Sequence, residues 1–218
     1  MTDSTRWTVI RGAAAGDESA RRHFAGRYEP VIRSYLGARW RGSPLLAEVD
    51  DATQDVFVAC FSEGGALSRV EEDGPGRFRS YLFGVTRNIA RRVEEKGQRR
   101  REQSLESDQI AGDRSLSDVF DRAWARQLVH RAARLHRSRA SDDRAKKRVE
   151  LLELRFGDGL PIREIAARWG ADAAALHREY AKARSEFQDA LREVVRDEEG
   201  GGPESIEKEC ERMISIFR

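Results

Sequence analysis

The chain has 218 residues, enough for one large or two small domains. Charged residues make up 36% of it, yet the formal net charge is only +2. The two cysteines, Cys60 and Cys210, lie far apart, which argues against a disulfide framework and fits a reducing compartment. No stretch approaches the roughly 20 apolar residues of a membrane span, and the first residues lack the apolar run of a signal peptide. We therefore expect a cytoplasmic protein with no membrane partner.

An all-α fold is predicted, because prolines are few and alternating strand patterns are scarce. Asp17 fits the N-cap of a first long helix that runs to about Arg41. The break at 42–44 separates it from a second helix, expected from about Leu46 to Glu63.

The stretch from Glu48 to Asp73 is acidic, with eight Asp and Glu residues against one Arg. At helical spacing Asp51, Gln54 and Asp55 share one face, which we expect to be exposed. A face of this charge suits a basic protein surface and would repel DNA. A metal site on these carboxylates is disfavoured, because the sequence offers no further ligand set.

The stretch from Arg77 to Arg101 reverses the charge, with nine Lys and Arg residues against two Glu. We expect one helix whose apolar residues face a core. Cations meet phosphates and flat rings accept unstacked bases, so the pattern favours a single strand of nucleic acid. The alternative is a solvated basic helix whose aromatic residues belong to the core. The candidate nucleic-acid contacts are Phe78, Arg79, Tyr81, Arg87, Asn88 and Arg91.

Residues 102–115 are rich in Ser, Asp, Glu, Gln and Gly, which predicts a linker. We therefore expect two small helical domains, one at 1–101 and one at 116–195, joined by this linker. An acidic tail follows at 196–218. Its last helix, from about Glu204 to Phe217, has an apolar stripe that would dock on the protein itself or on a regulatory partner.

Within the second domain, Ile162 to Tyr180 has the pattern of a helix-turn-helix. Gly170 stands where the turn needs a positive φ, and Asp172 fits the N-cap of a helix that begins at Ala173. An ordinary helical hairpin has the same spacing, so both interpretations stay open at this point. Glu179 would either read cytosine or pair with a neighbouring cation. The candidate contacts with duplex DNA are Ala174, His177, Arg178, Lys182 and Arg184.

The search for catalytic chemistry finds no phosphate-binding loop, no nucleophile elbow and no His/Cys cluster with metal spacing. We therefore expect a protein that is not an enzyme and needs no cofactor.

Three segments together resemble a bacterial RNA polymerase sigma factor of the extracytoplasmic-function (ECF) type. The segment VDDATQDVFVACF is similar to the part of that family that binds core polymerase. It is followed by FRSYLFGVTRNIARRVEEKGQRRR, similar to the part that melts and reads the minus-ten promoter element. After the linker comes LRFGDGLPIREIAARWGADAAALHREYAKAR, similar to the domain that reads the minus-thirty-five element. The likeness covers about residues 20–195.

The resemblance implies a transcription-initiation factor whose partners are core RNA polymerase and promoter DNA, both duplex and melted. It places Asp51, Gln54 and Asp55 against the clamp helices of the polymerase, and Asn88 with its basic neighbours against the minus-ten strand. Tyr81 stands where the family often has Trp. The loop at 67–77 would capture a flipped base, although its acidic run at 71–73 is unfavourable for DNA. An anti-sigma or other regulatory protein is a further partner that the resemblance allows.

Two alternatives remain open at the level of sequence. One is a helix-turn-helix regulator that binds duplex DNA without polymerase. The other is a helical interaction protein or anti-regulator that does not bind DNA. The neutral run Ala173-Ala174-Ala175 and the acidic loop favour this last alternative.

Overall fold

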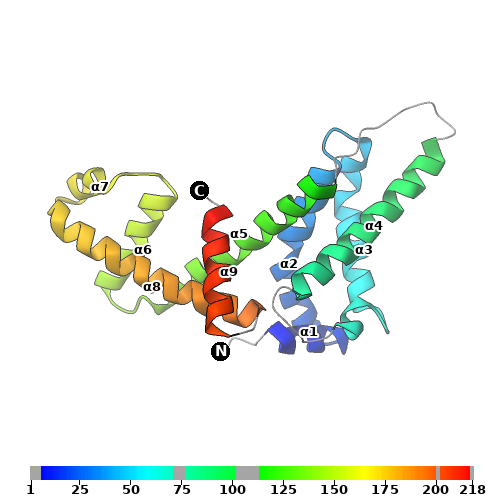
Figure 1. Cartoon of the computed structure of the whole chain (residues 1–218), viewed down its shortest axis with the longest axis horizontal. Helices are drawn as coiled ribbons and strands as arrows, with labels where there is room; N and C mark the ends of the chain where they lie inside the picture. The colour runs from blue at the N-terminus through cyan, green and yellow to red at the C-terminus, as the bar shows by residue number, and fades with distance from the viewer. Residues whose placement is uncertain (1–5, 71–76, 102–112, 200–201, 217–218) are drawn as a thin grey trace. The chain divides into compact units, whose positions relative to one another are not determined.

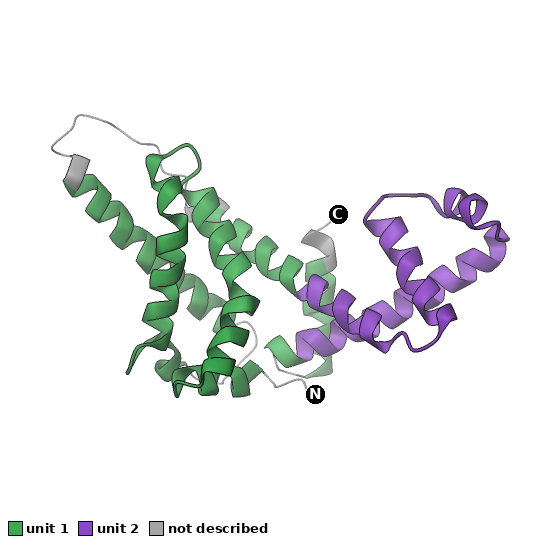
Figure 2. Ribbon diagram, turned by 180° about the vertical axis from the view of Figure 1, so that it is seen from behind, with its two compact units in different colours: residues 1–127, 197–218 green, residues 128–196 purple. Residues whose placement is uncertain are grey.

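The computed structural model describes residues 6–70, 77–101, 113–199 and 202–216. Every regular element in these ranges is helical, so the predicted all-α fold is confirmed (Figure 1). The chain divides into two compact units, which differ from the predicted domains. Unit 1 comprises residues 1–127 and 197–218, and unit 2 comprises residues 128–196 (Figure 2).

The part of unit 1 that precedes α5 contains four α-helices in the described residues, with short 3-10 helices between them. Asp17 caps α2 (Glu18–Arg39), the first long helix, as predicted, since its side chain accepts a hydrogen bond of 2.6 Å from the backbone N–H of Ala20. Helices α2, α3 and α4 pack on one another, and α1 packs on α2. The elements are α1 (Arg6–Ala14), α2 (Glu18–Arg39), η1 (Pro44–Glu48), α3 (Val49–Phe61), η2 (Ala66–Arg69) and α4 (Arg77–Arg101).

An aromatic cluster forms the centre of unit 1. Tyr28 of α2 lies 5.2 Å from the ring of Phe78 and stacks on Trp124 at 5.3 Å between ring centroids. Phe24 contacts both Tyr28 and Phe78 at 4.7 and 6.0 Å. All four rings are buried. Aromatic pairs at these spacings add about 0.5–1.5 kcal/mol each to the burial of their apolar surface.

Trp124 lies on α5 (Asp113–Arg139), which contains residue 116, the position where the second domain was predicted to begin. That boundary is wrong, because residues up to Gln127 belong to unit 1 and only the later part of the helix belongs to unit 2. The physical reason is the apolar stripe of α5, since Phe120 packs on Tyr35 and Phe83 of unit 1. The predicted linker is also shorter at its end, because α5 begins at Asp113; residues 102–112 lie outside the described ranges.

Glu94 shows that an acid inside the basic helix can have a structural role. Its carboxylate accepts hydrogen bonds of 2.6 and 2.9 Å from Arg39 and one of 2.8 Å from the indole of Trp40. The hydrogen bonds to Glu94 raise the pKa of Arg39. These contacts join the end of α2 to the second half of α4.

The C-terminal segment returns to unit 1. Glu198, near the end of α8 (Ala173–Glu199), is completely buried and accepts a hydrogen bond of 2.6 Å from the hydroxyl of Tyr28. Arg27 lies 3.4 Å from the same carboxylate. The last helix, α9 (Pro203–Ile216), buries Ile206, Cys210 and Met213, so the predicted tail helix packs on the protein itself. Phe217, assigned to the same helix from sequence, lies outside the described residues.

Unit 2 contains α6 (Asp143–Phe156), α7 (Ile162–Trp169) and most of α8. The predicted turn is confirmed, because Gly170 has φ 61° and the N–H of Ala171 donates to the carbonyl of Ala166 at 2.9 Å. Asp172 caps α8 by accepting a hydrogen bond of 2.7 Å from the N–H of Ala175. One apolar core joins α6, α7 and α8, and it is formed by Leu151, Ile162, Ile165, Ala166 and Leu176.

None of the helices in the described ranges is long and apolar enough to span a membrane. Within the same ranges, the His, Cys, Asp and Glu side chains form no group that could hold a metal ion.

Because α9 packs through buried apolar side chains, removing one of these side chains should lower the stability of the protein. Met213→Ala should lower the free energy of unfolding by about 2–5 kcal/mol, because it leaves a cavity where a fully buried side chain stood. Thermal and urea denaturation measure the change. The matched control is Glu211→Ala on the exposed side of the same helix, expected to stay within about 0.5 kcal/mol of the wild type. Equal stability of the two variants would contradict the docking of α9.

Candidate functional site

The acidic face predicted on α3 is present in the structure. Asp51, Gln54 and Asp55 are all exposed, and Val58 continues the face with 63% of its surface accessible. Asp50 lies on a neighbouring face and forms a 2.5 Å ion pair with Arg33 of α2. α3 therefore exposes two carboxylates, an amide and an apolar side chain on the same side of the helix.

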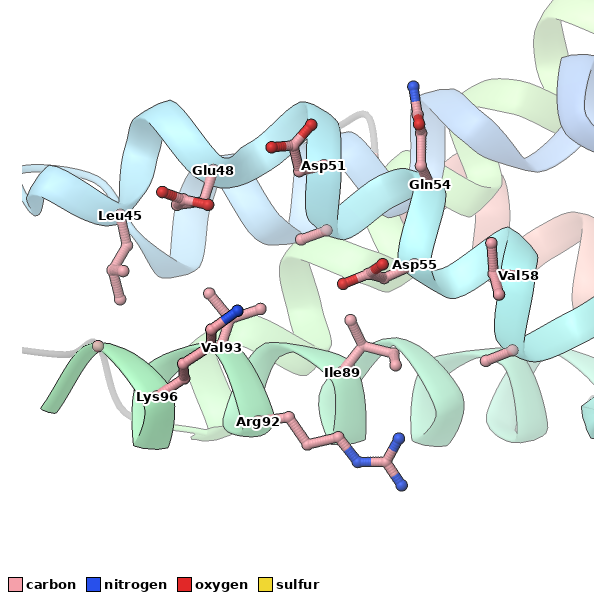
Figure 3. Close-up of a pocket in the computed structure, with 13 residues that line it drawn as sticks. Leu45, Glu48, Asp51, Gln54, Asp55, Val58, Ile89, Arg92, Val93 and Lys96 are labelled. Carbon is pink, nitrogen blue, oxygen red and sulfur yellow. The ribbon is translucent and has the colours of Figure 1, made fainter. Parts of the chain in front are cut away.

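An open groove of about 710 Å³ runs between α3 and α4 beside this face. Figure 3 shows Asp55 pointing into it from α3, and Ile89 and Val93 pointing towards α3 from α4, whereas Gln54 points away from α4. The floor is apolar, one wall is acidic and the other is basic. The lining residues are Leu45, Glu48, Asp51, Ala52, Gln54, Asp55, Val58, Ala59, Ile89, Arg92, Val93, Lys96 and Gly97.

The exposed side of α4 is polar and cationic. Asn88 and Arg91 are exposed as predicted, and Arg87 is half-buried. Arg92 and Lys96 are also exposed and belong to the basic wall of the groove. Sequence reasoning assigned no site role to these last two. Their spacing from Ile89 and Val93 indicates a shared side of the helix, but it does not reveal that α3 lies opposite.

Phe78 was predicted to contact nucleic acid, and the structure contradicts this. Its ring has no exposed surface, because it lies inside the aromatic cluster of unit 1. Tyr81 is half-buried, and its hydroxyl donates a hydrogen bond of 2.7 Å to the carbonyl of Ala66. The exposed candidates on the described part of α4 are therefore cations and an amide, and Phe78 is not available as a stacking ring.

Arg79 is also less available than predicted. Its guanidinium lies 3.0 Å from Glu209 of α9 and 3.4 Å from Asp121 of α5, and only 18% of the side chain is exposed. Two carboxylates of the same chain thus occupy the place that the sequence assigned to a phosphate.

The loop predicted to capture a flipped base, 67–77, is only partly described. Leu67 is buried in η2, so it packs inside unit 1. Residues 71–76, which carry the acidic run, lie outside the described ranges.

In unit 2 the predicted DNA-reading residues share an accessible region of α8. Ala174, His177 and Arg178 are exposed near its N-terminus, and Lys182 is exposed one turn later. Arg184 is exposed too, and its guanidinium lies 5.8 Å from the ring centre of Tyr180. The core contacts of Leu176 and Ala183 leave these five side chains outside.

Glu179 is committed to ion pairs inside unit 2. It pairs with Arg144 and lies 3.5 Å from Arg148 of α6. The hydrogen bond from Arg144, followed by the two positive charges, lowers the pKa of its carboxyl. Arg148 also lies 2.9 Å from Glu186, so the two acids fix α8 against α6. Of the two roles considered for Glu179, the structure supports pairing with a cation.

Comparison of the chain with models of known protein families gives no match, and a search of curated proteins also gives none. Its class is therefore defined by its own geometry: a two-unit helical chain with an acidic face, a basic helix and a helix-turn-helix.

The Glu179 ion pairs predict an acid-dependent loss of stability. A carboxyl whose pKa is lowered by folding stabilises the folded state above its unfolded pKa and loses that effect as the pH falls through the folded pKa. Glu179→Gln should lower the melting temperature at pH 7 and reduce the further loss between about pH 5 and pH 3. Glu150→Gln on the exposed side of α6 is the control. An unchanged acid dependence in Glu179→Gln would contradict the assignment.

Proposed function

We propose that the chain is a promoter-specificity subunit of RNA polymerase of the sigma type, and not an enzyme. One observation carries the proposal: unit 1 exposes an acidic face on α3 next to an exposed cationic side of α4, and unit 2 exposes the N-terminal end of the second helix of a helix-turn-helix. The resemblance of the three sequence segments to that family supports the same function.

The acidic face suits a protein partner. Asp51 and Asp55 would meet cations of core polymerase, and the exposed Val58 beside them would contribute apolar contact. DNA is an unsuitable ligand for this face, because phosphates and carboxylates repel each other. The groove between α3 and α4 adds an apolar floor that could receive a side chain of the partner.

The exposed side of α4 suits the backbone of a melted strand. Arg91 would neutralise phosphates, and Asn88 could hydrogen-bond an unpaired base. Since Phe78 is in the core, recognition by the described part of α4 rests on charge and hydrogen bonding more than on stacking. Strand opening would be driven by binding energy, with no nucleotide hydrolysis.

The helix-turn-helix suits duplex DNA. A recognition helix enters the major groove with its N-terminal residues first, which places Ala174, His177 and Arg178 near base edges. Lys182 and Arg184 lie further along α8 and would hold phosphates, which position the unit without reading sequence.

The first test concerns the protein partner. Reversing Asp51 and Asp55 to Lys should abolish pull-down of core RNA polymerase while leaving the helical circular dichroism signal unchanged, because both side chains are exposed. Glu63→Lys, an exposed acid just beyond the end of α3, is the control that should retain binding. Undiminished pull-down by the reversed variant would contradict the assignment of this face of α3 to the polymerase, and absence of pull-down by the wild type would overturn the proposed function. Tight duplex binding without any polymerase contact would favour an ordinary helix-turn-helix regulator.

The second test concerns sequence reading. Arg178→Ala should relax selection at one base pair, since a bidentate contact to guanine is worth about 1–3 kcal/mol of discrimination. Lys182→Ala should weaken all sequences alike, because a phosphate contact carries no sequence information. Selection from a promoter library with a randomised upstream element measures both effects. If Arg178→Ala and the wild type select the same sequence, Arg178 does not read a base.

A further inference from the structure

The C-terminal helix α9 belongs to unit 1 and packs on the rest of that unit through one apolar and one charged side. Ile206, Cys210 and Met213 recur at helical spacing and are buried. Glu209 lies between them in the sequence, and its carboxylate is only 18% exposed. The docking of α9 therefore brings an acidic side chain to a fixed place on unit 1.

That place is the N-terminal end of the basic helix. Glu209 lies 3.0 Å from the guanidinium of Arg79, and Arg212 of α9 bonds the same carboxylate at 2.8 Å through its Nε. Asp121 of α5 lies 3.4 Å from Arg79 and 4.0 Å from Arg212. The four groups form one alternating cluster of two guanidinium groups and two carboxylates.

The charges in this cluster keep Glu209 ionised. Burial alone would raise the pKa of its carboxyl, but the hydrogen bond from Arg212 and the charges of Arg79 and Arg212 lower it overall. At neutral pH the side chain is therefore an anion in contact with Arg79, which is the position that a phosphate of a nucleic acid would take.

We propose that α9 is a built-in competitor that restrains nucleic-acid binding by α4: the Glu209 carboxylate occupies Arg79 until α9 separates from the rest of unit 1. The proposal rests on the proposed function, in which the exposed cations of α4 hold a melted strand. It adds the regulation, by the protein's own C-terminal helix, of a further cation at the N-terminal end of the same helix α4.

The competition follows from the limited room at Arg79. The Arg79 side chain is only 18% exposed and lies within 3.4 Å of two carboxylates, so a phosphate that binds the guanidinium would compete with Glu209 for it. The undocked form exposes three apolar side chains, and it is therefore a minor state in the free chain. The apparent affinity for nucleic acid falls in proportion to the population of that state.

The test uses the full-length chain and a short fluorescent single-stranded DNA. Glu209→Gln should bind about twofold to fivefold more tightly than the wild type, as expected for loss of a partly exposed ion pair. The logarithm of its binding constant should fall more steeply with the logarithm of salt concentration, by about 0.7 for one added phosphate contact. Glu211→Gln makes the same change in net charge on the exposed side of α9 and should match the wild type.

A second substitution assigns the gain to Arg79. Arg79→Ala should have little effect in the wild-type background, where Glu209 occupies the guanidinium, and should abolish the gain in the Glu209→Gln background. Met213→Ala weakens the docking of α9 without touching the charged cluster, and it should also tighten binding. If this variant fails to fold, the Glu209 and Glu211 pair still decides the result.

Equal affinities of Glu209→Gln and Glu211→Gln, including no binding by either, would overturn the proposal. So would an equal loss on Arg79→Ala in both backgrounds. These results are separable from those of the polymerase pull-down. A chain that binds core polymerase but shows no difference between the two glutamine variants keeps its proposed function and loses only the role of α9. A chain that shows the difference but does not bind polymerase keeps the restraint and loses the sigma assignment.

Discussion

The burial of Glu198 is the constraint on which much of unit 1 depends. A carboxylate without exposed surface is tolerated only where donors surround it, and here the hydroxyl of Tyr28 and the guanidinium of Arg27 serve that purpose. Burial and the nearby carboxylate raise the pKa of Tyr28 well above its usual value, which keeps the hydroxyl proton available for donation. The C-terminal end of α8 is thereby fixed to the middle of α2. The next helix, α9, also packs within unit 1.

The same tyrosine links this polar anchor to the apolar core. One face of its ring stacks on Trp124, and Phe78 lies against it from α4. The cluster therefore sets the rotation of α4 about its axis. With Phe78 and Leu82 inward, Asn88 and Arg91 are placed outward, so the cationic surface of α4 is a consequence of the aromatic packing.

Much of the local structure could be predicted because it is encoded over a few residues. Asp17 and Asp172 cap helices through backbone groups three residues ahead, and Gly170 permits a left-handed turn that side chains disfavour. The exposed face of α3 follows from the spacing of Asp51, Gln54 and Asp55 alone. The role of Phe78 could not be predicted in this way, because an aromatic residue among arginines satisfies the pattern of a nucleic-acid contact as well as that of a core residue.

The sequence by itself determined the all-helical class, the main helices, the two helices and glycine turn around Gly170, and the faces that carry charge, since these depend on contacts within one or two helical turns. Only the tertiary structure decided that the first half of α5 belongs to unit 1, that Phe78 is core, and that Glu209 lies on Arg79. The last two side chains are 130 residues apart, and no local spacing encodes their meeting. Such pairs arise when several apolar stripes are buried together, and each stripe alone is compatible with more than one neighbour.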